Sequence, residues 1–482
     1  MASVEPVVSL SDLKQLASDV VARARRAGAS DAEAVVAEGD EFSVLVRLGQ
    51  VETLKESGSR AMGLRVFFGQ RTASTSTSDF SADGIERLVA GAVSLAQITS
   101  EDPFAGLPDA DQFGITRASA TDGNVGHPDA NLVHPDANLG LYFDDVYSLP
   151  PDQRLDYARR AEAAAMAVDA RIQNSDGGSF DAATGHKILA NSRGFVGEKR
   201  SSYCSVSAMP IAQDATGGMQ RDYWYSAART LRKLESPEAI GKEAARRTLR
   251  RLNARRVPTQ KAPIVFAAEI ARSIMGNIFE AANGDAIYRS ASFFAGKLGE
   301  QVAGENITVI DDGTMVFPDG VGGFGTTPFD GEGLPSRRTV VVERGVLKNY
   351  LLNTYTARKL NMKSTGNASR GLAGNPGIGA GNFYLEPGEV TPEKLIGDVK
   401  QGLYVTETMG FGVNLVTGDY SQGASGLWIE NGELAYAVEE ITIAGNLKDM
   451  YRNISAIGND LVFRGSSASP TIRVEGMTIA GA

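Results

Sequence analysis

The stretch FSVLVRLGQVETLK, Phe42–Lys55, contains the pattern that decides the fold of the N-terminal part of this chain. Every second residue from Phe42 to Leu48 is apolar, and most residues between them are polar. This period of two is typical of a strand with one buried face. Gly49-Gln50 predicts a turn, and Val51–Lys55 predicts the returning strand of an antiparallel pair.

The surrounding sequence extends this pair into a meander between helices. Strand-like runs follow at residues 61–68 and 72–78, and helical patterns lie at 11–28 and 83–97. Residues 101–151 are rich in Pro, Asp, Gly and Asn and predict a long connection. A helix at 154–168 and strands up to Ser226 then repeat the order, which suggests a diverged repeat. We therefore expect an α+β N-terminal domain over residues 1–257.

The C-terminal part has another texture. A short apolar strand at residues 264–266 leads into a helix with Ile270, Ile274 and Ile278 on one face, and glycine-rich strands follow. Asn431-Gly432 predicts a two-residue hairpin turn. We expect a mainly antiparallel β domain with few helices over residues 258–482, and a length of 482 residues is consistent with two domains.

Charge and composition exclude several function classes. The net charge of −10 disfavours a broad nucleic-acid surface. The segment KEAARRTLRRLNARR, 242–256, is basic, but aromatic residues do not alternate with its arginines. This segment is interpreted as a linker helix that has a solvated charged face and ends at Val257-Pro258. Nucleic-acid contact is the alternative. The start MASVEPVVSL lacks a basic region and an apolar core, no long apolar run follows, and Cys204 is the single cysteine. We expect a cytoplasmic protein without membrane contact.

The histidines limit metal chemistry. The three are His127, His134 and His186, and no H-E-x-x-H motif occurs. His127 and His134 belong to a duplicated heptad, HPDANLV then HPDANLG, which is interpreted as an exposed loop, with a metal clip as the alternative. His186 is predicted on a strand beside a turn. None of the three has the setting of a catalytic triad base.

Several segments of the C-terminal part resemble the TldD/PmbA family of bacterial and archaeal metallopeptidase subunits. They are SFFAGKLGEQV (292–302), PFDGEG (328–333), GVLKNYLLNTYTARKLNMKSTGNA (345–368), MGFGVNLVTGDYSQGASGLWIENGE (409–433) and EEITIAGNLKDMYRNISAIGNDL (439–461). The resemblance covers nearly the whole chain apart from the duplicated heptad.

The resemblance also implies a branch of the family. The TldD branch carries H-E-x-x-x-H on a helix, which supplies two zinc ligands and a general base, and a cysteine near the C-terminus as a further ligand. Here the corresponding helix reads RSIMGN, with Arg272 and Asn277 at the histidine positions and Ser273 at the glutamate position. The region near Gly465 reads RGSSASP and has no cysteine. The chain therefore resembles the PmbA (TldE) branch, and we expect no metal or other cofactor in it.

Membership in this branch implies a partner. Relatives pair with a TldD-type zinc subunit into a heteromeric peptidase that acts on unfolded or flexible peptides. The chain alone is then expected to be inactive, to complete the enclosed chamber and to help to bind peptide. A stand-alone, non-catalytic peptide-binding or scaffold protein, with a homodimer as one of its forms, is the alternative. A third possibility is a self-sufficient hydrolase with Ser273 or Ser421 as the nucleophile. The sequence offers no base to activate either serine, which disfavours it.

The candidate contact residues lie on two segments. They are the helix residues Arg272 and Asn277, and the loop residues Asn414, Thr417, Asp419, Tyr420 and Ser421. The glycine-rich loop is predicted either to line the peptide channel or to contact the partner, or else to be a tight connection within the sheet, with Asp419 capping its own turn. Asp330 and Glu332 are interpreted as part of a turn, with acid–base chemistry as the alternative.

Overall fold

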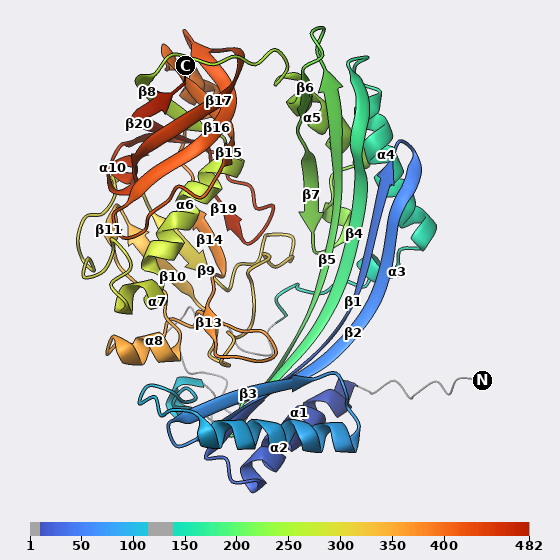
Figure 1. The fold of residues 1–482 in the computed structure, drawn as a ribbon, viewed down its shortest axis with the longest axis vertical. Coiled ribbons are helices and arrows are strands. Elements are labelled where there is room, and N and C mark those ends of the chain that lie inside the picture. The colour runs from blue at the N-terminus through green and yellow to red at the C-terminus, as the bar shows by residue number, and fades with distance from the viewer. Residues whose placement is uncertain (1–9, 114–137, 482) are drawn as a thin grey trace.

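The computed structural model describes residues 10–113 and 138–481 of the chain. Figure 1 shows a tall, curved sheet of long strands that faces a second group of sheets. We refer to residues 10–257 as the N-terminal half and to residues 258–481 as the C-terminal half. We propose residues 257/258 as the domain boundary, because no sheet of the described residues contains strands from both sides.

The N-terminal half is built on a seven-stranded antiparallel sheet in the order β3-β2-β1-β4-β5-β6, with β7 also paired to β5. Its strands are β1 Asp31–Arg47, β2 Gln50–Phe68, β3 Arg71–Thr77, β4 Ile172–Asn191, β5 Val196–Gln213, β6 Met219–Arg221 and β7 Trp224–Ala228. The order is symmetric about the β1–β4 pair, because β2 and β3 extend one side as β5 and β7 extend the other. This symmetry agrees with a diverged repeat.

The β1–β2 hairpin differs from its prediction in two details. The turn is Leu48-Gly49, with φ of 48° and 75°, and not Gly49-Gln50. Positive φ at both turn residues matches the right-handed twist of the strands. The predicted runs 51–55 and 61–68 form one strand, because the polar residues between them are paired along β1, with Gly58 opposite Asp40. Backbone pairing therefore continues where the apolar pattern stops.

Helices cover both ends of this sheet, as Figure 1 shows. They are α1 Leu10–Arg26, α2 Ala82–Ile98, α3 Asp145–Ser148, α4 Pro151–Met166 and α5 Pro237–Leu249, with 3-10 turns η1 Ala110–Phe113 and η2 Leu231–Lys233. Helices α1 and α2 share a core with β1–β3, and α4 and α5 share another with β4, β5 and β7. The helices predicted at 11–28, 83–97 and 154–168 are confirmed. The duplicated heptad, with His127 and His134, falls largely outside the described residues.

The C-terminal half contains mainly antiparallel sheets around one large core. Its strands are β8 Gln260–Phe266, β9 Val309–Asp312, β10 Arg338–Glu343, β11 Val346–Leu347, β12 Ala368–Ser369, β13 Gly377–Ile378, β14 Asn382–Leu385, β15 Gln401–Met409, β16 Asp419–Glu430, β17 Glu433–Asn446, β18 Ile454–Ile457, β19 Ser467–Ala468 and β20 Ile472–Ala480. Its helices are α6 Ala268–Ala282, α7 Gly284–Tyr288, α8 Thr354–Lys359, α9 Pro392–Gly397 and α10 Leu447–Arg452.

Two sheets position the C-terminal core. One has the order β11-β10-β9-β14-β19, and the other has β17-β16-β15-β8-β20-β18 with β17 also paired to β20. That additional pairing closes the second sheet on itself. The Asn431-Gly432 turn is confirmed between β16 and β17. The predicted α+β class, with a mainly antiparallel C-terminal domain, is thus confirmed, and β8–β15 and β14–β19 are parallel pairs within it.

The basic segment joins the two halves. Its helix ends at Leu249, before the predicted end at residue 256. Arg247 stacks over Trp224 at 4.6 Å from the ring centroid, Arg251 pairs with Glu407 of β15, and Arg255 lies over a tyrosine of β17. The prediction of a solvated charged face is therefore wrong for Arg247 and Arg251, because neighbours distant in the sequence cover them, whereas Arg255 remains exposed.

No helix among the described residues has both the length and the apolar character needed to span a membrane.

Candidate functional site

Helix α6 carries the first group of candidate residues. Ile274, Met275 and Ile278 pack into the C-terminal core and fix the rotation of the helix. Arg272 and Asn277 therefore lie on its partly exposed face. Asn277 donates from Nδ2 to its own helix, at 3.1 Å from the Ser273 carbonyl oxygen, whereas Arg272 makes no hydrogen bond or ion pair within the described residues.

Arg272 lines a small cavity between the two halves. The cavity has a volume of about 40 Å³ and is bounded by α6, by Tyr225 of β7 and by residues 462–469. A Cβ atom at Gly465 would lie 3.9 Å from Arg272 Nη1. The two segments that the resemblance associates with zinc binding are therefore adjacent, although about 190 residues separate them in the sequence. Arg464 anchors the second segment by donating to the Tyr225 carbonyl oxygen at 3.1 Å.

The side chains at this place do not fit a zinc ion. Zinc in proteins is bound by imidazole, thiolate or carboxylate groups. Here Arg272 presents a guanidinium, which repels a cation, and Gly465 presents no side chain. The described part of the chain contains no group of three or more His, Cys, Asp or Glu residues able to hold a metal ion.

The histidine and the cysteine inside the described ranges lie in the N-terminal sheet. His186 is a strand residue of β4, as predicted, with Nδ1 3.3 Å from Glu38 Oε1. Cys204 is fully buried on β5, and burial raises the pKa of its thiol to about 12. A thiol held protonated is a poor ligand and nucleophile, so Cys204 is a core residue.

The loop before β16 contains the second group. Asn414 Oδ1 accepts from the backbone N–H of Val416 and Thr417, at 2.9 and 3.2 Å. Thr417 Oγ1 donates to Asp419 Oδ2 at 2.6 Å, and Asn446 donates to Asp419 Oδ1 at 3.2 Å. These bonds lower the pKa of Asp419. The loop is thus held in one shape by its own polar side chains. Asn414 accepts the backbone N–H groups of the turn, whereas Asp419 accepts from the side chains of Thr417 and Asn446.

The side chains of this segment differ in their exposure to solvent. Tyr420 is 3% exposed and packs in the C-terminal core, so its position favours packing over a surface contact. Ser421 is exposed, and its backbone N–H donates to the Gly412 carbonyl oxygen at 2.6 Å. Phe411, which the sequence analysis did not select, is fully exposed beside the exposed Met409. Its signal in the sequence was an aromatic residue between two glycines.

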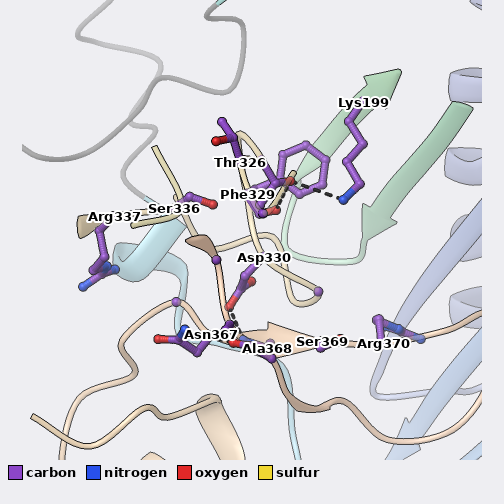
Figure 2. A pocket seen from close by; sticks show the side chains of 18 of the residues that line it. Lys199, Thr326, Phe329, Asp330, Ser336, Arg337, Asn367, Ala368, Ser369 and Arg370 are labelled. Atoms are coloured by element: carbon purple, nitrogen blue, oxygen red, sulfur yellow. Dashed lines mark hydrogen bonds between the residues drawn. The ribbon is translucent and has the colours of Figure 1, made fainter. Parts of the chain in front are cut away.

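Asp330 and Glu332 form a buried turn. Asp330 accepts backbone N–H groups from Glu332, Leu334 and Ala368, at 2.9, 2.9 and 3.0 Å, and Figure 2 shows the bond to Ala368. Glu332 accepts from the Thr354 backbone N–H at 2.9 Å. Burial is the main cause that raises the pKa of both carboxyls. The interpretation of these residues as part of a turn is confirmed.

Comparison with known proteins agrees with these features. Family models of the PmbA/TldA metallopeptidases match residues 32–96 (domain 1), 144–252 (central domain) and 259–481 (C-terminal domain). "Metalloprotease PmbA" of Escherichia coli O157:H7 is 38% identical over 94% of this chain and 93% of its own length.

Solved structures share the fold. A crystal structure from Bacteroides thetaiotaomicron matches with a TM-score of 0.86 at 26% identity, covering 99% of this chain and 100% of that chain. TldE from Thermococcus kodakarensis matches with a TM-score of 0.80 at 20% identity, covering 97% of this chain and 100% of its own. The chain therefore belongs to the TldD/PmbA metallopeptidase family and, within it, to the PmbA (TldE) branch.

Proposed function

We propose that this chain is the non-metal-binding subunit of a heteromeric TldD/TldE-type metallopeptidase. In this role it completes the chamber and helps to bind unfolded or flexible peptides, while a TldD-type partner supplies zinc. The observation that carries the proposal is the convergence of Arg272 and Gly465 on one place between the two halves. The two segments that the resemblance associates with zinc binding lie together there, and Arg272 and Gly465 carry no side chain that binds zinc.

Arg272 gives this place a different chemistry. Its guanidinium is partly exposed and has five donors in a fixed fork, which suits a carboxylate or carbonyl oxygen. Within the described residues no acidic side chain forms an ion pair with it, so its charge is available to a substrate group or to an acidic group of the partner. Asn277, five residues onward on the same helix, donates to the Ser273 carbonyl oxygen of its own helix.

The loop of residues 409–421 is proposed as a contact surface for the partner. Phe411 is fully exposed, and the loop that carries it is held by the Asn414, Thr417 and Asp419 bonds. A rigid loop loses little conformational entropy on binding, and an exposed aromatic side chain is a common binding anchor. Phe411 would therefore dock as a preformed anchor.

The first experiment measures metal and activity together. The untagged chain is purified alone, its zinc content is measured, and peptide hydrolysis is assayed with and without a TldD-type subunit. We expect close to zero zinc per chain, no hydrolysis by the chain alone, and hydrolysis after the partner is added. Tightly bound zinc at one ion per chain would contradict the proposal. Peptide binding without any association to the partner would instead support the stand-alone alternative.

A second experiment tests the loop. Phe411→Ala is compared with Ile98→Ala, which removes an 81% exposed apolar side chain at the end of α2. We expect Phe411→Ala to weaken association with the partner by tenfold or more, and Ile98→Ala to leave it unchanged. Both variants should keep the thermal stability of the parent, because neither side chain is buried. Equal association of both variants would remove Phe411 from the interface.

A further inference from the structure

A second cavity lies where the long sheet meets the C-terminal half. Its volume is about 240 Å³. Strands β1, β4 and β5 form one side of it, and the segments 311–337 and 365–381 form the other. Figure 2 shows that the Lys199 side chain reaches toward Phe329 and Asp330 across this junction. The cavity is separate from the Arg272 site, because the two share no lining residue.

Two lysines line the cavity without a carboxylate partner. Lys187 Nζ donates to the Arg370 carbonyl oxygen at 3.0 Å, and Lys199 Nζ lies 3.3 Å from Thr327 Oγ1. Both acceptors are neutral. Within residues 10–113 and 138–481, neither ammonium group forms an ion pair.

The surroundings disfavour the charge on both lysines. Burial lowers the pKa of Lys187 to about 8, and the positive charges of Lys199 and Arg370 add to this effect. Burial also lowers the pKa of Lys199, which Arg229 lowers further and Asp330 partly offsets. A buried cation without a counter-ion is costly, so an arrangement that gathers cations in one cavity needs a reason outside packing.

The nearest carboxyls are already committed to other donors. Asp330 accepts the three backbone N–H groups described above, and Asp311 accepts from Asn367 Nδ2 at 2.6 Å and from the Gly381 N–H at 2.7 Å. Burial raises the pKa of Asp311 to about 6. Glu33 pairs with Arg65 and Arg370. None of these carboxyls forms an ion pair with Lys187 or Lys199. The excess of positive charge lies in the lining itself, which has four basic side chains (Lys187, Lys199, Arg337 and Arg370) against Asp311 and Asp330.

We propose that this cavity is an oxyanion-binding site, in which Lys187 and Lys199 together hold a carboxylate or phosphate group of a small ligand. Lysine ammonium groups bind such anions as point charges, and the hydroxyl and amide groups of Ser336 and Asn367 line the same cavity. The volume limits the bound part to a small group, about the size of one amino-acid residue or a phosphate. The proposal follows from the lysines alone and does not rest on the peptidase assignment.

The test uses the full chain in a low-salt buffer at pH 7. Binding of inorganic phosphate, of a dipeptide with a free C-terminal carboxylate and of the same dipeptide as its amide is measured by calorimetry. We expect saturable binding of phosphate or of the free-acid dipeptide and none of the amide. Binding of phosphate alone would assign a free phosphate-bearing ligand, whereas binding of the free acid would assign a peptide carboxylate. No binding of any of these probes would overturn the proposal.

Matched variants separate the site from general electrostatics. Lys187→Gln and Lys199→Gln are each expected to weaken binding at least tenfold, and Lys55→Gln, which removes an exposed lysine of β2, should have no effect. Because each cavity variant removes a half-buried charge that has no ion-pair partner, both should fold with a thermal midpoint no lower than that of the parent in anion-free buffer. Binding that survives in both folded variants would overturn the assignment of the lysines.

Discussion

Buried charges are the individual residues that matter most in this structure. Glu33 is fully buried on β1 and pairs with Arg65 Nε at 2.5 Å and with Arg370 of the C-terminal half. Lys187 is half-buried nearby and lacks such a partner within the described residues. Substitution of Glu33 should lower the free energy of unfolding, because it leaves paired charges without their partner. Substitution of Lys187 should raise it, because it removes a charge that has no partner.

Replacement of Glu33 by glutamine should lower the free energy of unfolding by about 3–5 kcal/mol, because it removes the carboxylate that forms ion pairs with two buried guanidinium groups. Urea unfolding followed by circular dichroism measures this loss. Glu52→Gln is the control, since Glu52 is exposed and lies 3.7 Å from Arg47. That control should change stability by less than about 0.5 kcal/mol. Similar losses for the two variants would show that the Glu33 cluster is not a stabilising ion pair.

Lys187 predicts a pH dependence of stability. Its pKa is about 8 in the folded chain against the usual 10.5. Below pH 8 the group is protonated in both the folded and the unfolded state, so the full cost of burying its charge is present. Between pH 8 and 10.5 the unfolded chain binds the proton more tightly, so this group makes stability rise with pH.

The measurement compares the parent with Lys187→Gln from pH 7 to 10 in anion-free buffer. The variant should be more stable at pH 7 by up to about 3 kcal/mol, and this advantage should shrink as the pH rises through 8. A difference in stability that stays constant over this range would contradict the pKa shift. Saturating oxyanion should reduce the difference at pH 7, because the bound anion supplies the missing counter-charge.

At the scale of elements, two hairpins use the same turn geometry with different residues. The β1–β2 turn is Leu48-Gly49 and the β16–β17 turn is Asn431-Gly432, with φ of 48° and 51° at their first positions. Asparagine tolerates this left-handed region, whereas leucine is disfavoured there. In the β1–β2 turn, the carboxylate of Glu162 on α4 accepts the backbone N–H groups of Leu48 and Gly49, at 2.8 and 2.9 Å. Contact with α4 thus holds an unfavourable turn.

A reciprocal exchange tests this explanation. Leu48→Asn should raise the free energy of unfolding by about 1 kcal/mol, since the backbone strain is relieved and Leu48 is already 56% exposed. Asn431→Leu should lower it by a similar amount. Chemical denaturation of both variants gives the comparison. A change of the same sign in the two variants would show that the turn conformation does not control their stability.

At the scale of the whole molecule, the two halves are joined by polar contacts at several separate places. Arg370 meets Glu33, Arg251 meets Glu407, and Arg464 meets Glu235. The curved sheet and the C-terminal sheets face each other, as Figure 1 shows. Because the contacts include buried ions that would be left without partners on separation, we expect the halves to unfold together.

The two tryptophans report on this directly, because Trp224 lies in β7 and Trp428 in β16. Each single variant leaves one tryptophan. Trp224→Phe keeps Trp428 in the C-terminal half, and Trp428→Phe keeps Trp224 in the N-terminal half. We expect the urea midpoint from fluorescence to agree, within each variant, with the midpoint from circular dichroism. If the halves were independent, the fluorescence midpoints would separate from the circular dichroism midpoints. In the parent, the two midpoints are expected to agree. Adding Arg370→Ala to either tryptophan variant removes the Arg370–Glu33 contact between the halves, and the fluorescence and circular dichroism midpoints should then differ.

The sequence by itself determined the local secondary structure, the family and the residue types at the positions where the resemblance implies metal ligands. The alternation after Phe42 and the Asn431-Gly432 turn correctly predicted strands and a hairpin, because strand period and turn conformation depend on neighbouring residues. The segments around residues 292–302 and 409–433 identified the family, since their order and spacing are themselves a signal. The sequence also shows Arg272 and Asn277 at the positions where the resemblance implies zinc-binding histidines in the other branch, because this is a matter of residue type.

Only the tertiary structure decided which distant residues share an environment. It placed Gly465 beside Arg272, buried Tyr420, exposed Phe411 and put Lys187 and Lys199 into one cavity. These facts depend on how β1, β4 and β5 pack against segments far along the chain. Burial and electrostatic cost are properties of that packing and not of the local sequence, so only the folded molecule shows that Lys187 and Lys199 are half-buried charges without ion-pair partners among the described residues.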